Sequence, residues 1–369
     1  MFMEILKDHV IFLFKKLVFL IVFTEFVVWK NLGECCCHRW GNLLEKCDKI
    51  ESDFQIHFLY VGEGDSFVIK YYSQIKKENF LFIVDAGEGI SLIKKKTDVV
   101  QYIKSLMKST SVVGGKDEVI LVKEKQGKIN IEAFILTHPH PDHYWNMKEV
   151  FDNFNINNFF YYKMREDYKE MSLVDKFNCL QYEERVVAFM NAFKGTKQKL
   201  DFSQGSFSLF DDSTLKIEAI GPTEDHIDFN DNSIVLLITY KNFRFLLMGD
   251  AGIAAEKELI KFCDEGKGGI NINGVDLIKI GHHGHSTSSC KDFVDFVKPK
   301  NVVNSTGPHL LSCGLCNWHE TPSVMRLWRD CRNKDSGESV SILTTQEQGN
   351  IVAFVDESVD KASLKFCRN

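Results

Sequence analysis

The sequence has no surplus of basic residues, and this absence limits its partners. Its 369 residues carry 45 Lys and Arg against 51 Asp and Glu, a formal net charge of -6. The molecule as a whole therefore does not attract a polyanion, and any affinity for nucleic acid needs a local patch or a metal ion. The lysines at 94–96 and the basic helix expected after them are a candidate patch, although a charge run is more often a solvated face.

The cysteines lack the spacing of a disulfide framework. There are 11 of them, an odd number, with a run at 35–37, a CxxC at Cys313 and Cys316, and the rest scattered. Disulfide-rich domains have an even number of cysteines at regular spacings. We therefore expect no disulfide framework. We interpret the single CxxC as part of an ordinary loop, rather than as half of a zinc knuckle or as a redox pair.

The chain also lacks an uninterrupted apolar run of about 20 residues, the length that spans a bilayer. Residues 10–29 are strongly apolar, but Lys15 and Lys16 divide them and Glu25 interrupts the second half. Three interpretations of residues 1–50 stay open: a signal peptide or signal anchor, an amphipathic appendage, or a wrongly assigned first exon. Any membrane contact would be confined to residues 10–29, and the location stays open between the cytoplasm and a secreted or anchored state.

From about residue 53 the sequence changes to short apolar runs that end in glycine or aspartate. FQIHFLYVG, NFLFIVDAGEG and IEAFILTHPHPDH predict early strands, and STLKIEAIGP, SIVLLITYKNFRFLLMGDAG and GVDLIKIGHHG predict later ones. Residues 90–109, 145–154 and 183–194 have the spacing of helices. Alternating strands and helices, without repeats or a long linker, predict sheets covered by helices in one domain over residues 51–369.

The stretch HPHPDH, directly after a predicted strand, contains a dense group of ligand-type residues. His138 and His140 are two positions apart, so in an extended backbone their imidazoles point the same way and can bind one metal ion. Asp142 and His143 follow Pro141, which bends the chain and lets them reach a second ion. Four such side chains within six residues predict a metal site rather than an inert polar loop.

Two later strand ends carry residues of the same kind. Asp250 ends the run FLLMGD, where a carboxylate is costly to bury unless it is paired or binds metal. It is therefore a candidate bridge between two cations. His282 and His283 end another strand, and His285 follows closely. Ligand-type residues at several strand ends predict that they converge on one site.

These motifs, in this order, resemble the metallo-β-lactamase superfamily. Within it they are most similar to the nuclease-like domain of ComEC-type competence proteins and its free-standing relatives. The likeness covers residues 53–356: VGEGDSFVI resembles a VGQGDS turn, VDAGEG a DxG, NDNSIVLLI an NNxSLVL segment, FRFLLMGDA a strand ending in GD, and HHGHSTS an HHGS element. NSTGPHLLSCGLCNWHETPS approximates a late N…HPS element. The resemblance implies a four-layer αββα sandwich of the α/β (α+β) class, with a metal site at one edge between the sheets.

The resemblance also implies a dinuclear site and the role of each ligand. The first ion would be held by His138 and His140, the second by Asp142 and His143, and Asp250 would bridge them. His283 would complete the site, with His282 as the alternative, because the sequence cannot tell which imidazole faces inward.

Supporting roles follow from the same likeness. Asp85 would orient a ligand histidine, and Asp65 would fix the turn near the site. Asn232 stands in the motif where many members have another histidine, and the nearby His226 lies outside the motif. This departure leaves the first ion short of a ligand, so manganese joins zinc as a candidate metal.

His319, in NWHETPS, resembles the histidine of the late HPS element. We interpret it as a contact to a substrate oxygen or a proton donor to the leaving group, with a buried structural histidine as the alternative. Its spacing departs from the family, because Glu320 and Thr321 precede Pro322.

The function implied is hydrolysis. Two divalent cations about 3.5–4 Å apart can lower the pKa of a bridging water and clamp a phosphoryl or carbonyl oxygen, and the resulting hydroxide attacks while Asp142 orients it. The expected substrate is a phosphodiester, as for a nuclease or phosphodiesterase. The alternatives are a small ester, lactone or thioester substrate, or a non-catalytic binding protein with the same fold. Tyr144 and Trp145 could stack on a base, although packing of the next helix is the more ordinary role.

Overall fold

The computed structural model describes most of the chain after residue 43. The described ranges are 44–47, 50–89, 96–108, 111–113, 116–118, 124–125, 127–163, 186–203, 205–224, 226–307, 321–358 and 361–369. All of them belong to one compact unit, Gly41–Asn369. The predictions for residues 1–43, for the CxxC and for His319 lie outside these ranges and stay predictions, as does a domain boundary near residue 50. None of the helices within the described ranges is long and apolar enough to cross a membrane.

The first large sheet has nine strands in the order β18-β17-β1-β2-β3-β7-β8-β9, with β6 paired to β7. Its strands are β1 (Phe54–Phe58), β2 (Ser66–Ser73), β3 (Glu78–Ala86), β6 (Glu124–Lys125), β7 (Lys128–Ile135), β8 (Asn155–Tyr161), β9 (Thr196–Lys199), β17 (Ile351–Asp356) and β18 (Ser363–Arg368). β3, β7, β8 and β9 are parallel to one another. Their carboxyl ends therefore meet at one edge of the sheet.

The second large sheet has seven strands in the order β10-β11-β12-β13-β14-β15-β16. These are β10 (Ser206–Asp211), β11 (Leu215–Ile220), β12 (Val235–Tyr240), β13 (Phe243–Leu247), β14 (Leu277–Lys279), β15 (Asn301–Asn304) and β16 (Ser341–Thr344). The first half is antiparallel, whereas β13 to β16 are parallel. A separate small hairpin joins β4 (Ser111–Val113) and β5 (Lys116–Glu118).

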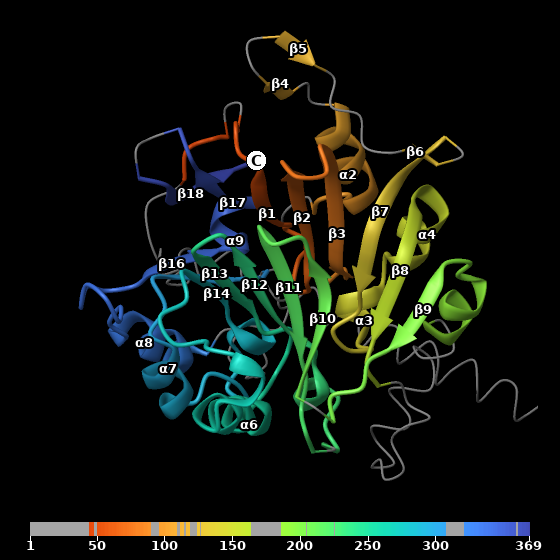
Figure 1. The fold of residues 1–369 in the computed structure, drawn as a ribbon. Coiled ribbons are helices and arrows are strands. Elements are labelled where there is room, and N and C mark those ends of the chain that lie inside the picture. Colours follow the sequence, from red (N-terminus) through yellow and green to blue (C-terminus); the bar gives the residue numbers. More distant parts are fainter. Residues whose placement is uncertain are drawn as a thin grey trace, which may run out of the picture. The chain divides into compact units, whose positions relative to one another are not determined.

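Helices cover the outer face of each sheet (Figure 1). The covering helices are α2 (Val99–Lys108), α4 (Met147–Asn153), α6 (Ile253–Asp264), α7 (Lys291–Val297) and α8 (Pro322–Asp330), and two short helices, α3 (Pro141–Tyr144) and α9 (Thr345–Gln348), follow strand ends. α2 and α4 lie beside the first sheet, and α6, α7 and α8 lie beside the second. Helix, sheet, sheet, helix is the four-layer αββα arrangement predicted from the sequence, which the structure confirms.

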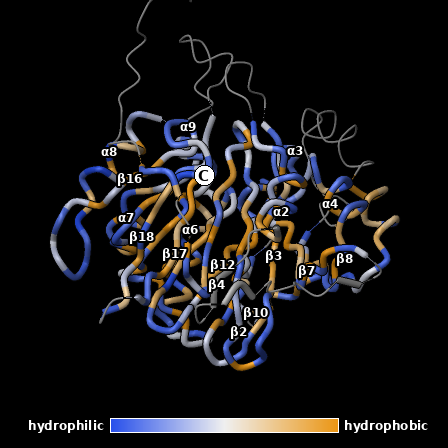
Figure 2. The backbone as a smooth tube through the Cα atoms, turned by 90° about the horizontal axis from the view of Figure 1, so that it is seen from above, coloured by the Kyte–Doolittle hydropathy of each residue, from blue (hydrophilic) through white to orange (hydrophobic). Residues whose placement is uncertain are grey.

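Strand alternation explains why the layers stack in this order. In β1, Phe54, Ile56 and Phe58 face the second sheet and join the core between the sheets. Phe54 stacks on Tyr240 of β12 across that core, with ring centroids 4.8 Å apart. Side chains on the opposite face of the first sheet, such as Val68, pack under α2 and α4. Figure 2 shows the central strands in the hydrophobic colours, as two packed sheets require.

Among the described residues there is one disulfide, which the cysteine spacing did not predict. Cys47 and Cys367 are bonded across a separation of 320 residues. Around it, Lys46 forms a parallel bridge with Arg368, so residues 44–47 continue the edge of the first sheet beyond β18. Irregular spacing excludes a framework of several bridges, but it cannot exclude one bond between the two ends of a domain.

Candidate metal centre

The predicted ligand residues lie at the ends of strands from both sheets. Asp85 is the penultimate residue of β3, and β7 leads into the loop and short helix α3 that carry HPHPDH. In the second sheet, Asp250 follows β13 and the HH pair follows β14. Since both groups of parallel strands end at this edge, residues from four strands meet there.

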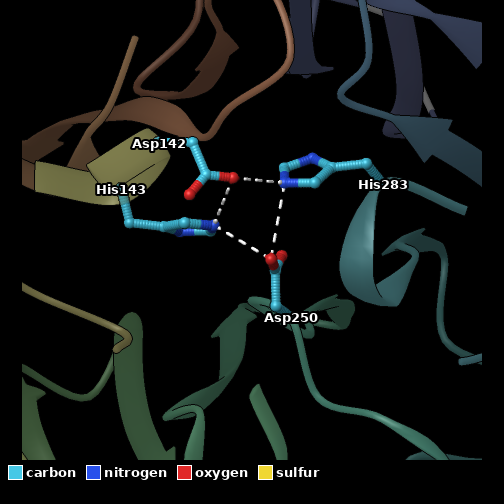
Figure 3. Close-up of side chains that lie close together, drawn as sticks. All are labelled: Asp142, His143, Asp250 and His283. Carbon is cyan, nitrogen blue, oxygen red and sulfur yellow. Dashed lines mark ion pairs between the residues drawn. The ribbon is translucent and has the colours of Figure 1, made fainter. Parts of the chain in front are cut away.

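Four side chains close a ring at this edge. Ligand atoms of Asp142, His143, Asp250 and His283 all lie within 4.8 Å of one another. Figure 3 shows the two carboxylates alternating with the two imidazoles around a common centre. Asp250 Oδ2 lies 3.1 Å from His143 Nε2 and 3.4 Å from His283 Nε2. Asp142 Oδ2 lies 3.3 Å from His283 Nε2 and 3.7 Å from His143 Nε2.

His138 and His140 lie beside this ring rather than within it. His138 Nε2 is 3.0 Å from His140 Nδ1 and 3.8 Å from Asp250 Oδ2. The His138 ring also approaches His143, with centroids 4.1 Å apart. The structure thus places His138 next to Asp250, and His140 reaches this group only through its contact with His138.

The buried carboxylate of Asp85 holds His143 in place. Asp85 Oδ2 accepts a hydrogen bond from His143 Nδ1 at 2.7 Å, and the same carboxylate accepts from the backbone N–H of Thr137 at 2.8 Å and from its hydroxyl at 2.7 Å. His143 thus directs Nδ1 toward Asp85 and Nε2 toward the ring, so Nε2 is the nitrogen that a metal ion would bind once it is deprotonated. Asp85 has φ +56, a left-handed conformation that points its side chain back under the loop.

Glycine makes the close approach of this loop possible. A Cβ on Gly87 would lie 1.4 Å from the carbonyl oxygen of Asp142. The DxG pattern at 85–87 therefore combines a carboxylate that orients a histidine with a glycine that lets α3 pack against the same loop.

The HHG turn separates the two histidines that the sequence could not distinguish. His282 and His283 both have positive φ, +43 and +51. His283 is turned inward, where its Nδ1 donates to the carbonyl oxygen of Ser305 at 2.8 Å, so its Nε2 also faces the ring. His282 lies outside the ring, and its Nδ1 is 2.7 Å from Thr287 Oγ1.

Asp65 and Lys279 form an ion pair beneath the ring. Both side chains are fully buried, and Lys279 Nζ also donates to the carbonyl oxygen of Gly249 at 2.9 Å. Lys279 Nζ lies 3.7 Å from Asp250 Oδ1, and Asp65 Oδ1 lies 3.6 Å from His283 Nδ1. Lys279 was not among the site residues predicted from the sequence. The available signal was a charged residue inside the apolar run DLIKIG, two positions after a core leucine and hence on the inner face.

Asn232 is directed away from the ring. Its Nδ2 donates to the backbone oxygens of His226 and Asp228, both at 2.8 Å, so the side chain closes the turn before β12. His226 pairs through Nε2 with Glu258 at 2.9 Å. Neither residue adds a third imidazole beside His138 and His140.

Charge and burial act against each other at the ring. Burial alone would lower the pKa of His283, but the nearby carboxylates of Asp250, Asp65 and Asp142 raise it to about 10. Burial raises the pKa of Asp250, yet His283 and His143 hold it well below its usual range. The ring therefore favours ionised carboxylates around a centre of positive charge.

Unsatisfied buried atoms provide a test of whether a metal ion fits. His143 Nε2, His283 Nε2, Asp250 Oδ1 and Asp65 Oδ1 are buried without a hydrogen-bond partner in the described part of the chain. Such atoms are costly unless a ligand satisfies them. Imidazole nitrogen and carboxylate oxygen are ligands for Zn²⁺, and Mn²⁺ accepts the same mixture. Clustered His and Asp residues of this kind indicate a dinuclear metal site.

The two aromatic residues after His143 separate into different environments. Tyr144 is fully buried and belongs to the core between the first sheet and its helices. Trp145 keeps 42% of its surface exposed. The expectation of packing therefore describes Tyr144, while Trp145 presents aromatic surface to solvent two residues after His143.

Comparison with known proteins identifies the family. The model of the metallo-beta-lactamase superfamily matches residues 60–307. ComE operon protein 3 of Bacillus subtilis (strain 168) is 21% identical over 276 residues. That match covers 74% of this chain but 31% of the relative, so the chain spans about a third of that protein's length.

Solved structures with a similar arrangement have low sequence identity. Unliganded yeast PDE1 is 12% identical with a TM-score of 0.43, covering 82% of this chain and 99% of that one. The metallo-beta-lactamase fold protein YhfI from Bacillus subtilis is 10% identical with a TM-score of 0.42, covering 81% and 98%. The short form of human tRNase Z is 14% identical with a TM-score of 0.34, covering 68% and 91%.

Proposed function

Since the chain belongs to the metallo-β-lactamase superfamily and is a metal-dependent hydrolase, we propose that its substrate is a phosphodiester. The observation that carries the proposal is the ring of Asp142, His143, Asp250 and His283, whose buried ligand atoms converge on one centre. Two divalent ions bound there would polarise a phosphoryl oxygen and activate a water for attack. Phosphodiesters suit such a site because their transition state is anionic at several oxygens.

The residues divide into three sets in this proposal. His138 and His140 would hold one ion, Asp142, His143 and His283 would hold the other, and Asp250 would supply a carboxylate to both. Zinc is the expected metal, and manganese is the alternative because Asn232 adds no third histidine to the first set. His282 stays outside both sets, since its Nδ1 faces Thr287.

The catalytic part of the proposal belongs to Asp142. Its side chain is 31% exposed, whereas that of Asp250 is 1% exposed, so Asp142 is the ring carboxylate that an incoming water and substrate can reach. Its Oδ2 is held by His283 and His143, which leaves it fixed in direction while it orients the attacking water. Asp85 and Asp65 keep the ligands in place from behind.

The test combines metal analysis of the full chain with hydrolysis of bis-p-nitrophenyl phosphate in added Zn²⁺ or Mn²⁺. We expect two metal ions per chain and turnover that His140→Ala and Asp250→Ala abolish. His226→Ala is the matched control, because its imidazole pairs with Glu258 and should affect neither reading. Two bound metals without phosphodiester turnover would move the substrate to a small ester, lactone or thioester. A chain that binds no divalent metal would refute the proposal.

A further inference from the structure

We propose that Lys279 is a built-in counter-ion of the metal centre, which takes the place of metal charge beside Asp65 and Asp250 and so stabilises the metal-free ring more than the metal-bound one. This inference rests on the proposed metal site and concerns a residue to which the proposed reaction gives no role. It assigns Lys279 as a positioning residue, because it acts through Asp250.

The place of Lys279 in the fold puts its charge between the two sheets. It ends β14, in register with Leu247 of β13 and Val303 of β15. Leu277, two positions earlier, belongs to the core between the sheets, so Lys279 shares that inward face. Its ammonium group meets Asp65 of the first sheet and lies 5.9 Å from the centre of the Phe67 ring. The ion pair thus joins the two halves of the site.

The two carboxylate oxygens of Asp250 have different neighbours. Oδ2 is the oxygen near His143, His283 and His138. Oδ1 lies 3.7 Å from Lys279 Nζ and is buried without a hydrogen bond. A positive charge on the Oδ1 side holds the carboxylate plane and leaves Oδ2 as the oxygen presented to metal.

Asp65 extends this arrangement to the catalytic side. Its backbone N–H donates to the carbonyl oxygen of Asp142 at 3.1 Å, and its own carbonyl accepts from Gly87 N at 2.9 Å. Ser305, whose carbonyl accepts from His283, also donates through its hydroxyl to Gly64 at 2.9 Å. The Asp65–Lys279 pair therefore lies where the supports of Asp142, Asp250 and His283 meet.

The charge of Lys279 has opposite effects on the two states of the protein. Without metal, it is the ion-pair partner of Asp65 and adds to the charges of His143 and His283 that offset the buried carboxylate of Asp250. With divalent ions bound, Asp250 is already neutralised and the ammonium group repels the ions. Because Lys279 stabilises the metal-free state more than the metal-bound state, linkage requires that its removal tightens metal binding.

The experiment titrates the metal-free full chain with Zn²⁺ or Mn²⁺ by calorimetry and follows thermal unfolding with and without the ion. We compare the wild type with Lys279→Met and Asp65→Asn. Lys279→Met should bind the ion at least tenfold more tightly, with a lowered unfolding temperature that metal restores. Asp65→Asn should bind at least tenfold more weakly, because a negative charge is lost while Lys279 remains.

Lys300→Met is the matched control. Lys300 pairs with Asp276 at 3.0 Å and precedes β15, at the opposite end of the same parallel strands. Its loss should change stability without changing metal affinity.

Metal affinity is expected to rise in Lys279→Met and to fall in Asp65→Asn. These opposite changes distinguish a counter-ion from a merely structural ion pair, because loss of a structural pair would make both variants bind metal more weakly. Unchanged or weaker binding by Lys279→Met would overturn the inference while leaving the metal site intact. So would a Lys279→Met chain that fails to fold even in saturating metal. A wild type that binds neither ion would refute the proposed site and this inference with it.

Discussion

The Asp85→Asn substitution tests whether the proton position on His143 controls metal binding. The Asp85 carboxylate is fully buried and accepts three hydrogen bonds, two from Thr137 and one from His143 Nδ1. An asparagine keeps one acceptor oxygen, which the backbone N–H of Thr137 occupies. Its amide N–H then faces His143 Nδ1, and the imidazole proton must move to Nε2. A protonated Nε2 cannot bind a metal ion.

The expected loss is about 10- to 100-fold in metal affinity, the usual cost of changing a residue that orients a ligand histidine. This corresponds to about 1.4–2.7 kcal/mol. Calorimetric titration of the metal-free chain with Zn²⁺ measures it directly. Asp212→Asn is the control, because Asp212 also accepts hydrogen bonds that are partly buried, from Tyr71 at 2.8 Å and Ser73 at 2.7 Å, at a site away from the ring. Equal metal affinity in Asp85→Asn and the wild type would refute the reasoning.

Two further predictions concern stability. Burial, with a smaller effect of Lys70, lowers the pKa of His57 from 6.5 to about 3. Below pH 6.5, His57 is therefore protonated in the unfolded chain but stays neutral in the folded chain. The free energy of unfolding consequently falls as the pH drops. His57 should lower the free energy of unfolding by about 2 kcal/mol between pH 7 and pH 5. Urea unfolding at both pH values should show a smaller decrease in His57→Gln than in the wild type. An equal decrease in both would contradict the prediction. Replacing Cys47 and Cys367 by serine should lower the free energy of unfolding by about 2–5 kcal/mol, measured against Cys263→Ser, and a double variant as stable as the control would count against the bond.

The fold was predictable because its signals are local. The apolar runs predicted the strands, and the polar residues after them mark the strand ends. Parallel pairing of these strands then brings Asp85, the HPHPDH loop, Asp250 and the HH pair to one edge. The order of the motifs resembles that of the metallo-β-lactamase superfamily, and this resemblance implied the four αββα layers. The periodicity of the apolar residues alone does not indicate how the layers are arranged. The sequence therefore predicts which strand ends carry the site residues. Parallel pairing then places those strand ends side by side.

The choice between His282 and His283 could not be predicted, since it depends on backbone conformation. Both residues occupy left-handed φ, which few side chains adopt and which no spacing rule anticipates. Lys279 was missed for a different reason. A lysine in an apolar strand is usually read as a surface residue, and only the approach of Asp65 from the other sheet makes its burial tolerable. The Cys47–Cys367 bond likewise depends on contacts between distant segments.

Neither sheet can form the metal centre alone, and this links function to stability. The first sheet supplies Asp142 and His143 through α3, while the second supplies Asp250 and His283. An ion in the ring therefore binds only when the sheets are packed together, and it has no equivalent site in the unfolded chain. At a free concentration of 100 times its Kd such an ion stabilises the folded state by about 2.7 kcal/mol. Metal occupancy and packing of the two sheets are thus one equilibrium, and a substitution that loosens the core between the sheets should weaken metal binding without touching a ligand.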